Sequence, residues 1–311
     1  MKKLVKPVLQ AATHTALAPL ERRLLERHKD KGRWPHIFIL GAPRSGTSLF
    51  YELLVTRYQF SFFSNLAHRF WKTPVAASYV GRRIITRRNG AFQSTYGHIS
   101  GWSAPNEGGW IWQRWLVDGP WADESALRGL PTDEMRATLA AMSNIFAAPF
   151  VNKNVMHSNR IRLLNVLFPG CLFIEVRRDP AETVRSIIRA QQRHKGPDRN
   201  DDGWWSVQPS NAGGANLIER ACRQVTGVAA DIAKDSAHLN RDCLHIVDYA
   251  ALCSDPHKTL TETAVFLESR GMPVVPRAEV PDRFEASDIK LFPNEQEEQI
   301  AVNLEKPMDI L

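Results

Sequence analysis

The 311-residue sequence has no C-x-x-C pair and no long apolar run. Its four cysteines are scattered along a chain long enough to bury a sizeable core, which argues against a disulfide-stapled secreted domain. No segment approaches the roughly 20 apolar residues of a membrane-spanning helix. Near the start, Pro7, Gln10, Thr13 and His14 interrupt the apolar stretch and leave no core of a signal peptide. These absences favour a folded intracellular protein.

Excess positive charge is concentrated at the start of the chain. Residues 1–34 contain nine lysines and arginines against three acids, while the formal net charge of the whole chain is +7. The remainder is therefore nearly neutral, which argues against a protein that coats nucleic acid. Apolar residues at approximately helical intervals predict that 1–34 form a basic amphipathic arm with breaks at Pro7 and Pro19. The arm either packs on the domain that follows or attaches to an anionic membrane surface.

Short apolar runs alternate with helical patterns through the rest of the chain. We predict strands within residues 36–40, 148–154, 171–177 and 243–249, and helices after each of them. This alternation predicts one α/β domain over residues 35–311, with three layers and a central, mostly parallel sheet flanked by helices. Residues 196–216 are rich in Gly, Asn, Asp and Ser, and a loop of this length is typical of an active-site lid.

A glycine-rich loop joins the first predicted strand to the next helix. Residues 41–48, "GAPRSGTS", have the spacing G-x-x-x-x-G-x-[ST] of a phosphate-binding loop, so the fold is expected to be P-loop-like. In nucleotide triphosphatases a lysine follows the second glycine, whereas this chain has Thr47 there and Arg44 as its basic residue. The loop is therefore suited to an anion, but not to a triphosphate with Mg²⁺.

The same loop resembles the first signature, P-[RK]-S-G-T-[ST], of the sulfotransferases that use 3′-phosphoadenosine 5′-phosphosulfate (PAPS). The resemblance implies that five consecutive residues bind the 5′-phosphosulfate: Arg44, Ser45, Gly46, Thr47 and Ser48. It also implies PAPS as the sulfuryl donor, with no metal.

Three further segments carry this resemblance, which extends from about residue 36 to 268. The last of them, "HIVDYAALCSDPHKTLTETAVFLE", resembles a strand and helix of the family, although Asp248 and Tyr249 stand in the reverse of the family's order. The second signature of the family is a strand ending in R-[DN]-P with a serine eight residues after the arginine, and Arg178 and Ser186 match it. They are expected to hold the 3′-phosphate, because an arginine at a strand end and a hydroxyl in the next helix can converge on one phosphate. Lys153 in "FVNKN" is similar to the family's strand lysine and is expected, with Arg44, to balance charge on the transferring group.

The general base is less clear from the sequence. Some family members have a histidine two residues after the strand lysine, but this chain has Val155 there. Our first choice is Glu107 in "WSAPNEGGWIWQRW", which resembles the P-x-E segment of bacterial and carbohydrate-type members. His98, His157 and Glu52 are the alternatives.

Aromatic side chains crowd the expected acceptor region. Trp110 and Trp112 follow Glu107, and Trp204 and Trp205 stand in the otherwise polar lid loop. With His98, we expect them to contact the acceptor, although core packing is the simpler interpretation of Trp112 and its neighbours. The resemblance and the tryptophans favour a carbohydrate or glycolipid acceptor. We expect a cytoplasmic enzyme, with peripheral contact of the arm with the inner membrane as the alternative to its packing on the domain.

Two alternatives belong to other classes. A P-loop kinase or nucleotide triphosphatase requires a lysine at Thr47 and a metal-binding acid, for which Asp248 is the best candidate. A non-catalytic module that binds a glycan or a protein partner would make Glu107 and Lys153 dispensable.

Overall fold

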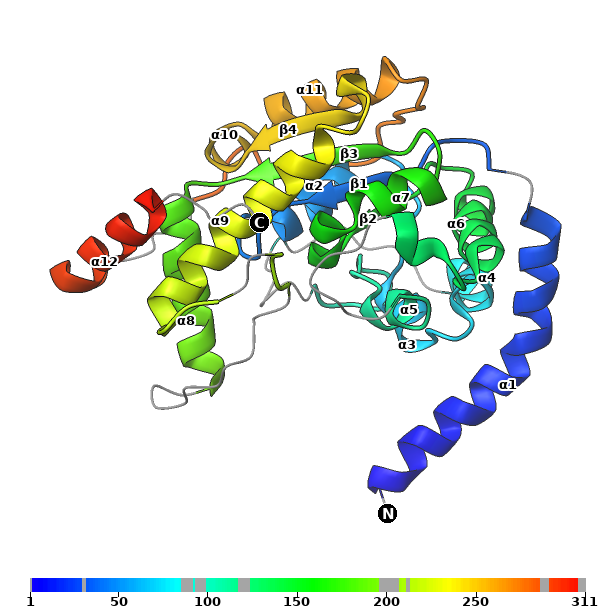
Figure 1. The fold of residues 1–311 in the computed structure, drawn as a ribbon. Coiled ribbons are helices and arrows are strands. Elements are labelled where there is room, and N and C mark those ends of the chain that lie inside the picture. Colours follow the sequence, from blue (N-terminus) through cyan, green and yellow to red (C-terminus); the bar gives the residue numbers. More distant parts are fainter. Residues whose placement is uncertain are drawn as a thin grey trace.

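The molecule is built around a parallel sheet. The computed structural model describes residues 2–29, 32–84, 92, 99–116, 124–195, 207–210, 213–285 and 291–306. Within these residues four parallel strands lie in the order β2-β1-β3-β4 (Figure 1). Their bounds are β1 (Ile37–Leu40), β2 (Val151–Lys153), β3 (Leu172–Arg177) and β4 (Leu244–Asp248). The predicted α/β class, parallel sheet and strand positions are confirmed.

Helices cover both faces of the sheet because every β1 residue is apolar and successive side chains point to opposite faces. Phe38 and Leu40 pack into one hydrophobic cluster, with α6 (Thr132–Phe146), α7 (Ile161–Leu167) and α9 (Leu217–Ser236). Ile37 and Ile39 pack into a second cluster on the other face. This face is covered by α2 (Thr47–Arg57), α10 (Tyr249–Ser254) and α11 (Pro256–Glu268). The result is the expected three-layer arrangement.

The order of the strands fixes where a ligand can bind. From β1 the chain passes to β2 on one side, and it then returns across the sheet to β3 on the other side of β1. In open parallel sheets the crevice at such a reversal, outside the carboxyl ends of the strands, is the usual ligand site. The loops that follow β1 and β3 carry the two sequence signatures, so the topology brings them to this crevice.

Further helices and short turns complete the fold. They are α3 (Asn65–Arg69), α4 (Pro74–Ile84), α5 (Gly109–Gln113), α8 (Pro180–Lys195) and α12 (Asn294–Glu305), with short 3₁₀ turns η1 (Glu124–Leu127), η2 (Val155–Asn159) and η3 (Arg241–Cys243).

The C-terminal segment, to which the sequence analysis assigned no role, braces α8. Ile300 of α12 packs with apolar residues of α8 and α9. Arg185 of α8 donates from Nε and Nη2 to the Glu297 carboxylate, with the shortest contact at 2.7 Å. Because α8 also carries Ser186, this clamp holds a predicted site residue in place.

The arm is one helix, α1 (Lys2–His28), so the predicted breaks at the two prolines were wrong. A proline inside a helix removes one backbone hydrogen bond, and here α1 is supported by packing against α4 and α6. The Glu21 carboxylate accepts hydrogen bonds from the backbone N–H groups of Val75 (3.3 Å) and Ala76 (2.6 Å) at the start of α4.

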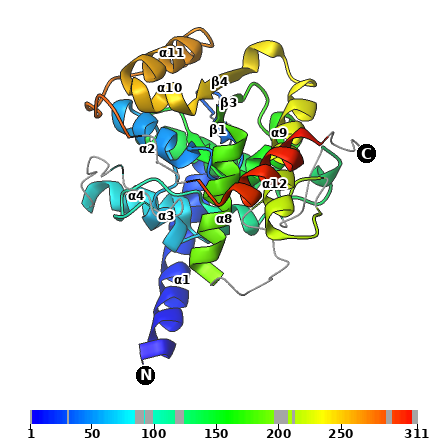
Figure 2. The same ribbon diagram turned by 90° about the vertical axis from the view of Figure 1, so that its left-hand side faces the viewer.

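The first turns of α1 project away from the body (Figures 1 and 2). Among the described helices, none is long and apolar enough to cross a membrane.

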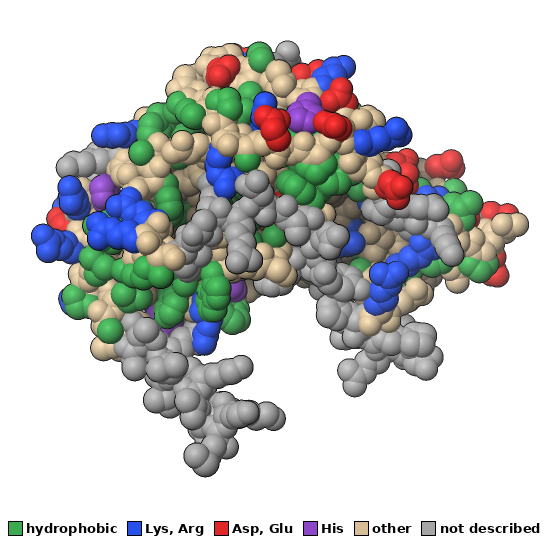
Figure 3. Space-filling view, turned by 180° about the vertical axis from the view of Figure 1, so that it is seen from behind, with side chains coloured by type: hydrophobic (Ala, Val, Ile, Leu, Met, Phe, Trp, Pro, Cys, Tyr) green, Lys and Arg blue, Asp and Glu red, His purple; other side chains and the backbone are tan. Residues whose placement is uncertain are grey.

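Charge is unevenly distributed over the surface. Seen from behind, basic side chains gather beside hydrophobic patches on the side that carries α1 and α4, whereas acidic side chains lie over α11 and α12 (Figure 3).

Candidate active site

The loop after β1 turns tightly against its surroundings. Gly41 and Gly46 have φ angles of 145° and 96°, and Arg44 has a φ of 69°. A Cβ atom at Gly46 would lie 2.1 Å from the Tyr249 ring, and one at Gly41 would lie 2.7 Å from the Val176 carbonyl oxygen. Both positions therefore require glycine. The loop leads into α2 at Thr47, where the first N–H groups of a helix lack intrahelical partners and favour an anion.

The hydroxyl residues of this loop are mostly enclosed. Ser45 is 2% and Thr47 3% exposed, while Ser48 is half-buried. The Oγ of Ser45 is buried and has no hydrogen-bond partner among the described residues. A buried hydroxyl usually has a partner, so this one is suited to an anion held by the loop.

The two signatures meet in space. Arg44 Nε donates a hydrogen bond of 3.1 Å to Ser186 Oγ on α8, across 142 residues of sequence. This contact brings the loop after β1 and the helix after β3 to one place. The two segments that carry the predicted cofactor residues therefore meet at the carboxyl edge of the sheet.

Arg178 lies next to this contact, at the end of β3. Its Nε donates to the Glu182 carboxylate at 2.9 Å, and its guanidinium carbon lies 4.5 Å from the centre of the Tyr249 ring. The side chain is only 4% exposed, yet Nη2 has no partner among the described residues. A buried guanidinium with a donor to spare is suited to a phosphate oxygen. Since the Tyr249 ring also closes against Gly46, it links Arg178 to the loop.

A third group of residues lies at the end of β2. Lys153, whose side chain is 4% exposed, forms a salt bridge with the Glu107 carboxylate, which is 32% exposed. Asn152 and Asn154 donate to the Glu107 carbonyl oxygen at 3.4 and 3.3 Å. Lys153 pairs with Ile39 of β1, so it stands beside the phosphate-binding loop. The structure thus joins the predicted base to the predicted lysine, which the sequence analysis placed in separate roles.

The alternative bases are less suited to the reaction. His157 is fully buried, and its Nε2 lies 2.8 Å from Asn152 Oδ1. Burial holds its pKa well below 6.5, and the nearby cations Arg160 and Lys153 lower it further. Glu52 is 1% exposed, and its carboxylate accepts a hydrogen bond from the backbone N–H of Phe92. Enclosed side chains cannot reach an acceptor, so Glu107 remains the candidate. His98 lies outside the described residues.

The structure separates the two tryptophans that follow Glu107. Trp110 is 50% exposed, stacks on His68 with ring centres 4.6 Å apart, and lines an open cavity of about 380 Å³ with Trp71. Trp112 is 1% exposed, and its Nε1 donates a hydrogen bond of 2.8 Å to Asn152 Oδ1. An acceptor contact by Trp112 was therefore the wrong expectation, because this ring packs in the core behind the strand. Trp204 and Trp205 lie outside the described residues, as does most of the predicted lid.

Other residues of the crevice were not predicted. Ser158 Oγ accepts a hydrogen bond from the Gly41 N–H at 3.0 Å and donates to the Gly41 carbonyl at 3.2 Å, so it fixes the start of the loop. Tyr249 follows β4. Its position at a strand end, in a segment that resembles the family, was the sequence signal that could have indicated it. No motif marks Ser158, whose partner is 117 residues away. Within the described part of the chain, no cluster of three or more His, Cys, Asp or Glu is placed to hold a metal.

Comparisons with known proteins agree with this fold. Among solved structures, the chain is similar to the sulfotransferase STF9 from Mycobacterium avium, with a TM-score of 0.55 and 16% identity over 93% of this chain and 71% of that one. It is also similar to the sulfotransferase STF1 from Mycobacterium tuberculosis H37Rv, with a TM-score of 0.53 and 18% identity over 83% of this chain and 73% of that one. At these identities the two structures establish a shared fold. A sequence search of curated proteins finds no match.

The sequence profile described as "Sulfotransferase family" matches residues 35–270, which is well over half of the chain and includes every element of the crevice. The protein therefore belongs to the sulfotransferase family and is an enzyme of sulfuryl transfer.

Proposed function

We propose that the enzyme transfers the sulfuryl group of PAPS to a hydroxyl group of a carbohydrate or glycolipid. The observation that carries this proposal is the meeting of the two signatures through the Arg44–Ser186 contact, beside the buried and incompletely paired guanidinium of Arg178. A crevice with a positive helix end, two arginines and two serines suits a ligand with two separate anionic groups.

The residues present fit such a donor. Arg44, Ser45 and the N-terminus of α2 would hold the 5′-phosphosulfate, since the Ser45 hydroxyl is buried without a partner and glycine gives the backbone close access. Arg178 and Ser186 would hold the 3′-phosphate, which ordinary adenine nucleotides lack. Bound PAPS supplies an activated sulfuryl group whose leaving group is a phosphate.

The acceptor side depends on the Lys153–Glu107 pair. In the proposed reaction the acceptor oxygen bonds to sulfur as the bond from sulfur to the bridging phosphate oxygen breaks, and the hydroxyl proton passes to Glu107. The products are a sulfate ester and 3′-phosphoadenosine 5′-phosphate (PAP). Lys153 stands beside the loop and balances charge as that bond breaks. When Lys153 turns toward the transferring group, the Glu107 carboxylate loses its partner and becomes available as the base.

A carbohydrate acceptor is supported by the exposed aromatic surface close to Glu107. Trp110 lies in the first turn of α5, which follows Glu107, and with Trp71 it lines an open cavity whose polar residues are Gln113 and Arg114. Flat aromatic rings beside an amide group are suited to a sugar, whose faces are apolar and whose rim bears hydroxyls.

The structure gives little support to a nucleotide triphosphatase. Asp248, the candidate metal ligand, caps α10 by accepting a hydrogen bond of 2.8 Å from the Ala251 N–H. Thr47 in place of the lysine leaves no basic side chain at that point of the loop.

Location in the cytoplasm, with α1 near the inner membrane, is part of the same proposal. The four cysteines are free thiols, as expected in a reducing compartment. On α1 the side chains of Arg22, Arg23 and Arg27 are exposed, while Leu24 is buried against the body. We expect the protein to sediment with anionic vesicles at low salt and to lose this binding when the three arginines are replaced by glutamine. Equal sedimentation of the variant would exclude this role.

Calorimetric titration tests the donor. PAP is expected to bind without Mg²⁺ and more tightly than AMP or Mg·ATP. Arg178→Ala is expected to weaken PAP binding about 10- to 100-fold, because hydrogen bonds to charged groups contribute roughly 1.5–3 kcal/mol. The matched control is Arg177→Ala, since that side chain is 54% exposed and pairs with Glu175 instead. A preference for Mg·ATP, or equal PAP affinity in both variants, would refute the proposed site.

A further inference from the structure

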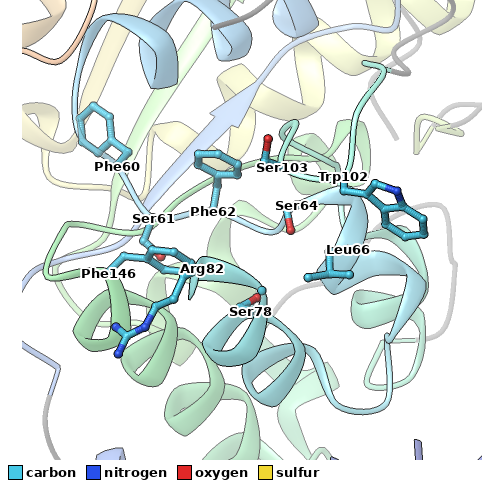
Figure 4. A pocket seen from close by; sticks show the side chains of 11 residues that line it. Phe60, Ser61, Phe62, Ser64, Leu66, Ser78, Arg82, Trp102, Ser103 and Phe146 are labelled. Atoms are coloured by element: carbon cyan, nitrogen blue, oxygen red, sulfur yellow. The ribbon is translucent and has the colours of Figure 1, made fainter. Parts of the chain in front are cut away.

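A second cavity lies beside the acceptor region and is not part of the donor crevice. It has a volume of about 310 Å³ and is bounded by the extended segment 60–64, by α4 and by the loop at 102–103. Its apolar walls are Phe60, Phe62, Leu66, Trp102 and Phe146 (Figure 4). This size lies at the lower end of known ligand sites and equals the space of about ten water molecules.

Serines line part of this cavity, but they add little polar surface to it. Ser61 is 1% and Ser78 4% exposed, and the Oγ atom of each is itself enclosed by protein. Figure 4 shows Ser64 and Ser78 approaching the same space from opposite sides. The surface offered to an occupant is therefore mainly apolar, which suits a hydrocarbon group.

Among the described residues that line the cavity, the one charged side chain is already engaged elsewhere. Arg82 lines it, but its guanidinium donates to the Ile145 carbonyl oxygen and lies 4.7 Å from the Tyr79 ring centre. Its aliphatic stem therefore adds to the apolar lining. A free sugar, with polar groups around its whole rim, would leave hydroxyls unpaired against the phenylalanine rings.

The cavity adjoins the reacting groups through its own walls. Segment 60–64 lies between the strand leading to Lys153 and the loop leading to Glu107, because Ser61 pairs with Phe150 and Ser64 with Pro105. Trp102, which is 56% exposed, stands at the rim on the same loop as Glu107. A molecule whose hydroxyl lies at Glu107 can therefore extend its other end past Trp102.

We propose that this cavity binds the apolar tail of the hydroxyl acceptor, so that the acceptor is an amphiphile of the glycolipid type rather than a free carbohydrate. The proposal rests on the proposed sulfotransferase function, because it assigns the second part of the same acceptor. The tail is an alkyl or aryl group of roughly six to ten heavy atoms.

Calorimetric titrations with n-alkyl β-glucosides, carried out with and without saturating PAP, test this proposal. Methyl and hexyl glucoside have identical sugar hydroxyls and differ only in the tail. Each buried methylene strengthens binding about fourfold, so the hexyl compound is expected to bind at least 100-fold more tightly than the methyl compound. Titration of 1-hexanol measures the binding affinity of the tail without the sugar.

Two variants and one control identify the site. Ser78→Leu fills the cavity. It is expected to weaken the binding of hexyl glucoside and of 1-hexanol at least tenfold, with PAP affinity unchanged. Val80→Leu is the control, since Val80 lies on the same helix, is 38% exposed and does not line the cavity. Leu66→Ala enlarges the cavity and is expected to move the preference from hexyl to octyl glucoside.

The outcomes separate the two proposals. Equal binding of methyl and hexyl glucoside, or a hexyl preference that survives in Ser78→Leu and is not shifted in Leu66→Ala, would overturn the tail site. Tail binding that follows the expected pattern without any PAP binding would support the cavity and overturn the sulfotransferase donor site instead.

Discussion

Replacement of Gly46 with alanine is expected to damage both the stability of the chain and its anion-binding loop. The φ angle of 96° is one that L residues adopt at a cost of roughly 1–3 kcal/mol. The new Cβ atom would also lie 2.1 Å from Cδ2 of Tyr249, whereas carbon atoms pack at about 3.5–4.0 Å. The ring, which is 7% exposed, must therefore move by more than about 1 Å within a packed environment. Overpacking of this kind costs a further 1–3 kcal/mol or so.

The two terms together predict a loss of about 2–6 kcal/mol in the free energy of unfolding, measured by urea titration. PAP affinity should fall at least tenfold, because displacement of the Tyr249 ring also disturbs the Arg178 guanidinium that it contacts. Gly109→Ala is the matched control, since a Cβ atom there meets nothing within 4 Å, and its unfolding free energy should stay within about 0.5 kcal/mol of the wild type.

A double variant separates the clash from the backbone strain. Tyr249→Ala removes the atoms that the new methyl group meets, so Gly46→Ala should be less damaging in that background than in the wild type. If Gly46→Ala unfolded at the wild-type urea concentration and bound PAP normally, the described geometry of this loop would be refuted.

The remaining predictions concern the acceptor side and the response to pH. Glu107→Gln should retain PAP binding and lower kcat about 10²- to 10⁴-fold, because a general base contributes this much; an unchanged kcat would remove Glu107 from the reaction. Burial raises the pKa of Glu21 to about 7, so its folded form keeps a proton that the unfolded chain releases above pH 4.5. Its contribution to stability is therefore lost as the pH rises from 4.5 to 7, by roughly 3 kcal/mol, and urea titrations across this range should show a smaller loss in Glu21→Gln. Burial between Phe150 and Phe168 lowers the pKa of His36 to about 4, which makes stability fall as the pH drops from 6.5 to 4. Acid urea titrations of His36→Phe should lack this fall, and if the variant lost stability as steeply as the wild type, His36 would not be its source.

The sequence by itself determined the class of fold and the location of the donor site. Alternating apolar runs and helical patterns gave the four strands because strand and helix periodicity depend on nearby residues. The loop at residues 41–48 and the pair Arg178 and Ser186 were recognisable for the same reason, since each motif is compact in sequence. Their meeting could be expected once both were placed at the carboxyl ends of parallel strands. The break expected at Pro19 was wrong because packing of the surrounding turns of α1 against the body outweighs a local preference.

Only the tertiary structure decided how these parts contact one another. Trp110 and Trp112 are two residues apart, yet one is half exposed and the other lies in the core, because their side chains leave α5 on different faces. The pairing of Lys153 with Glu107, the Tyr249 ring against Gly46 and the cavity beside α4 all join segments distant in sequence. Such contacts follow from how helices and strands pack in three dimensions, and no local spacing of residues encodes them.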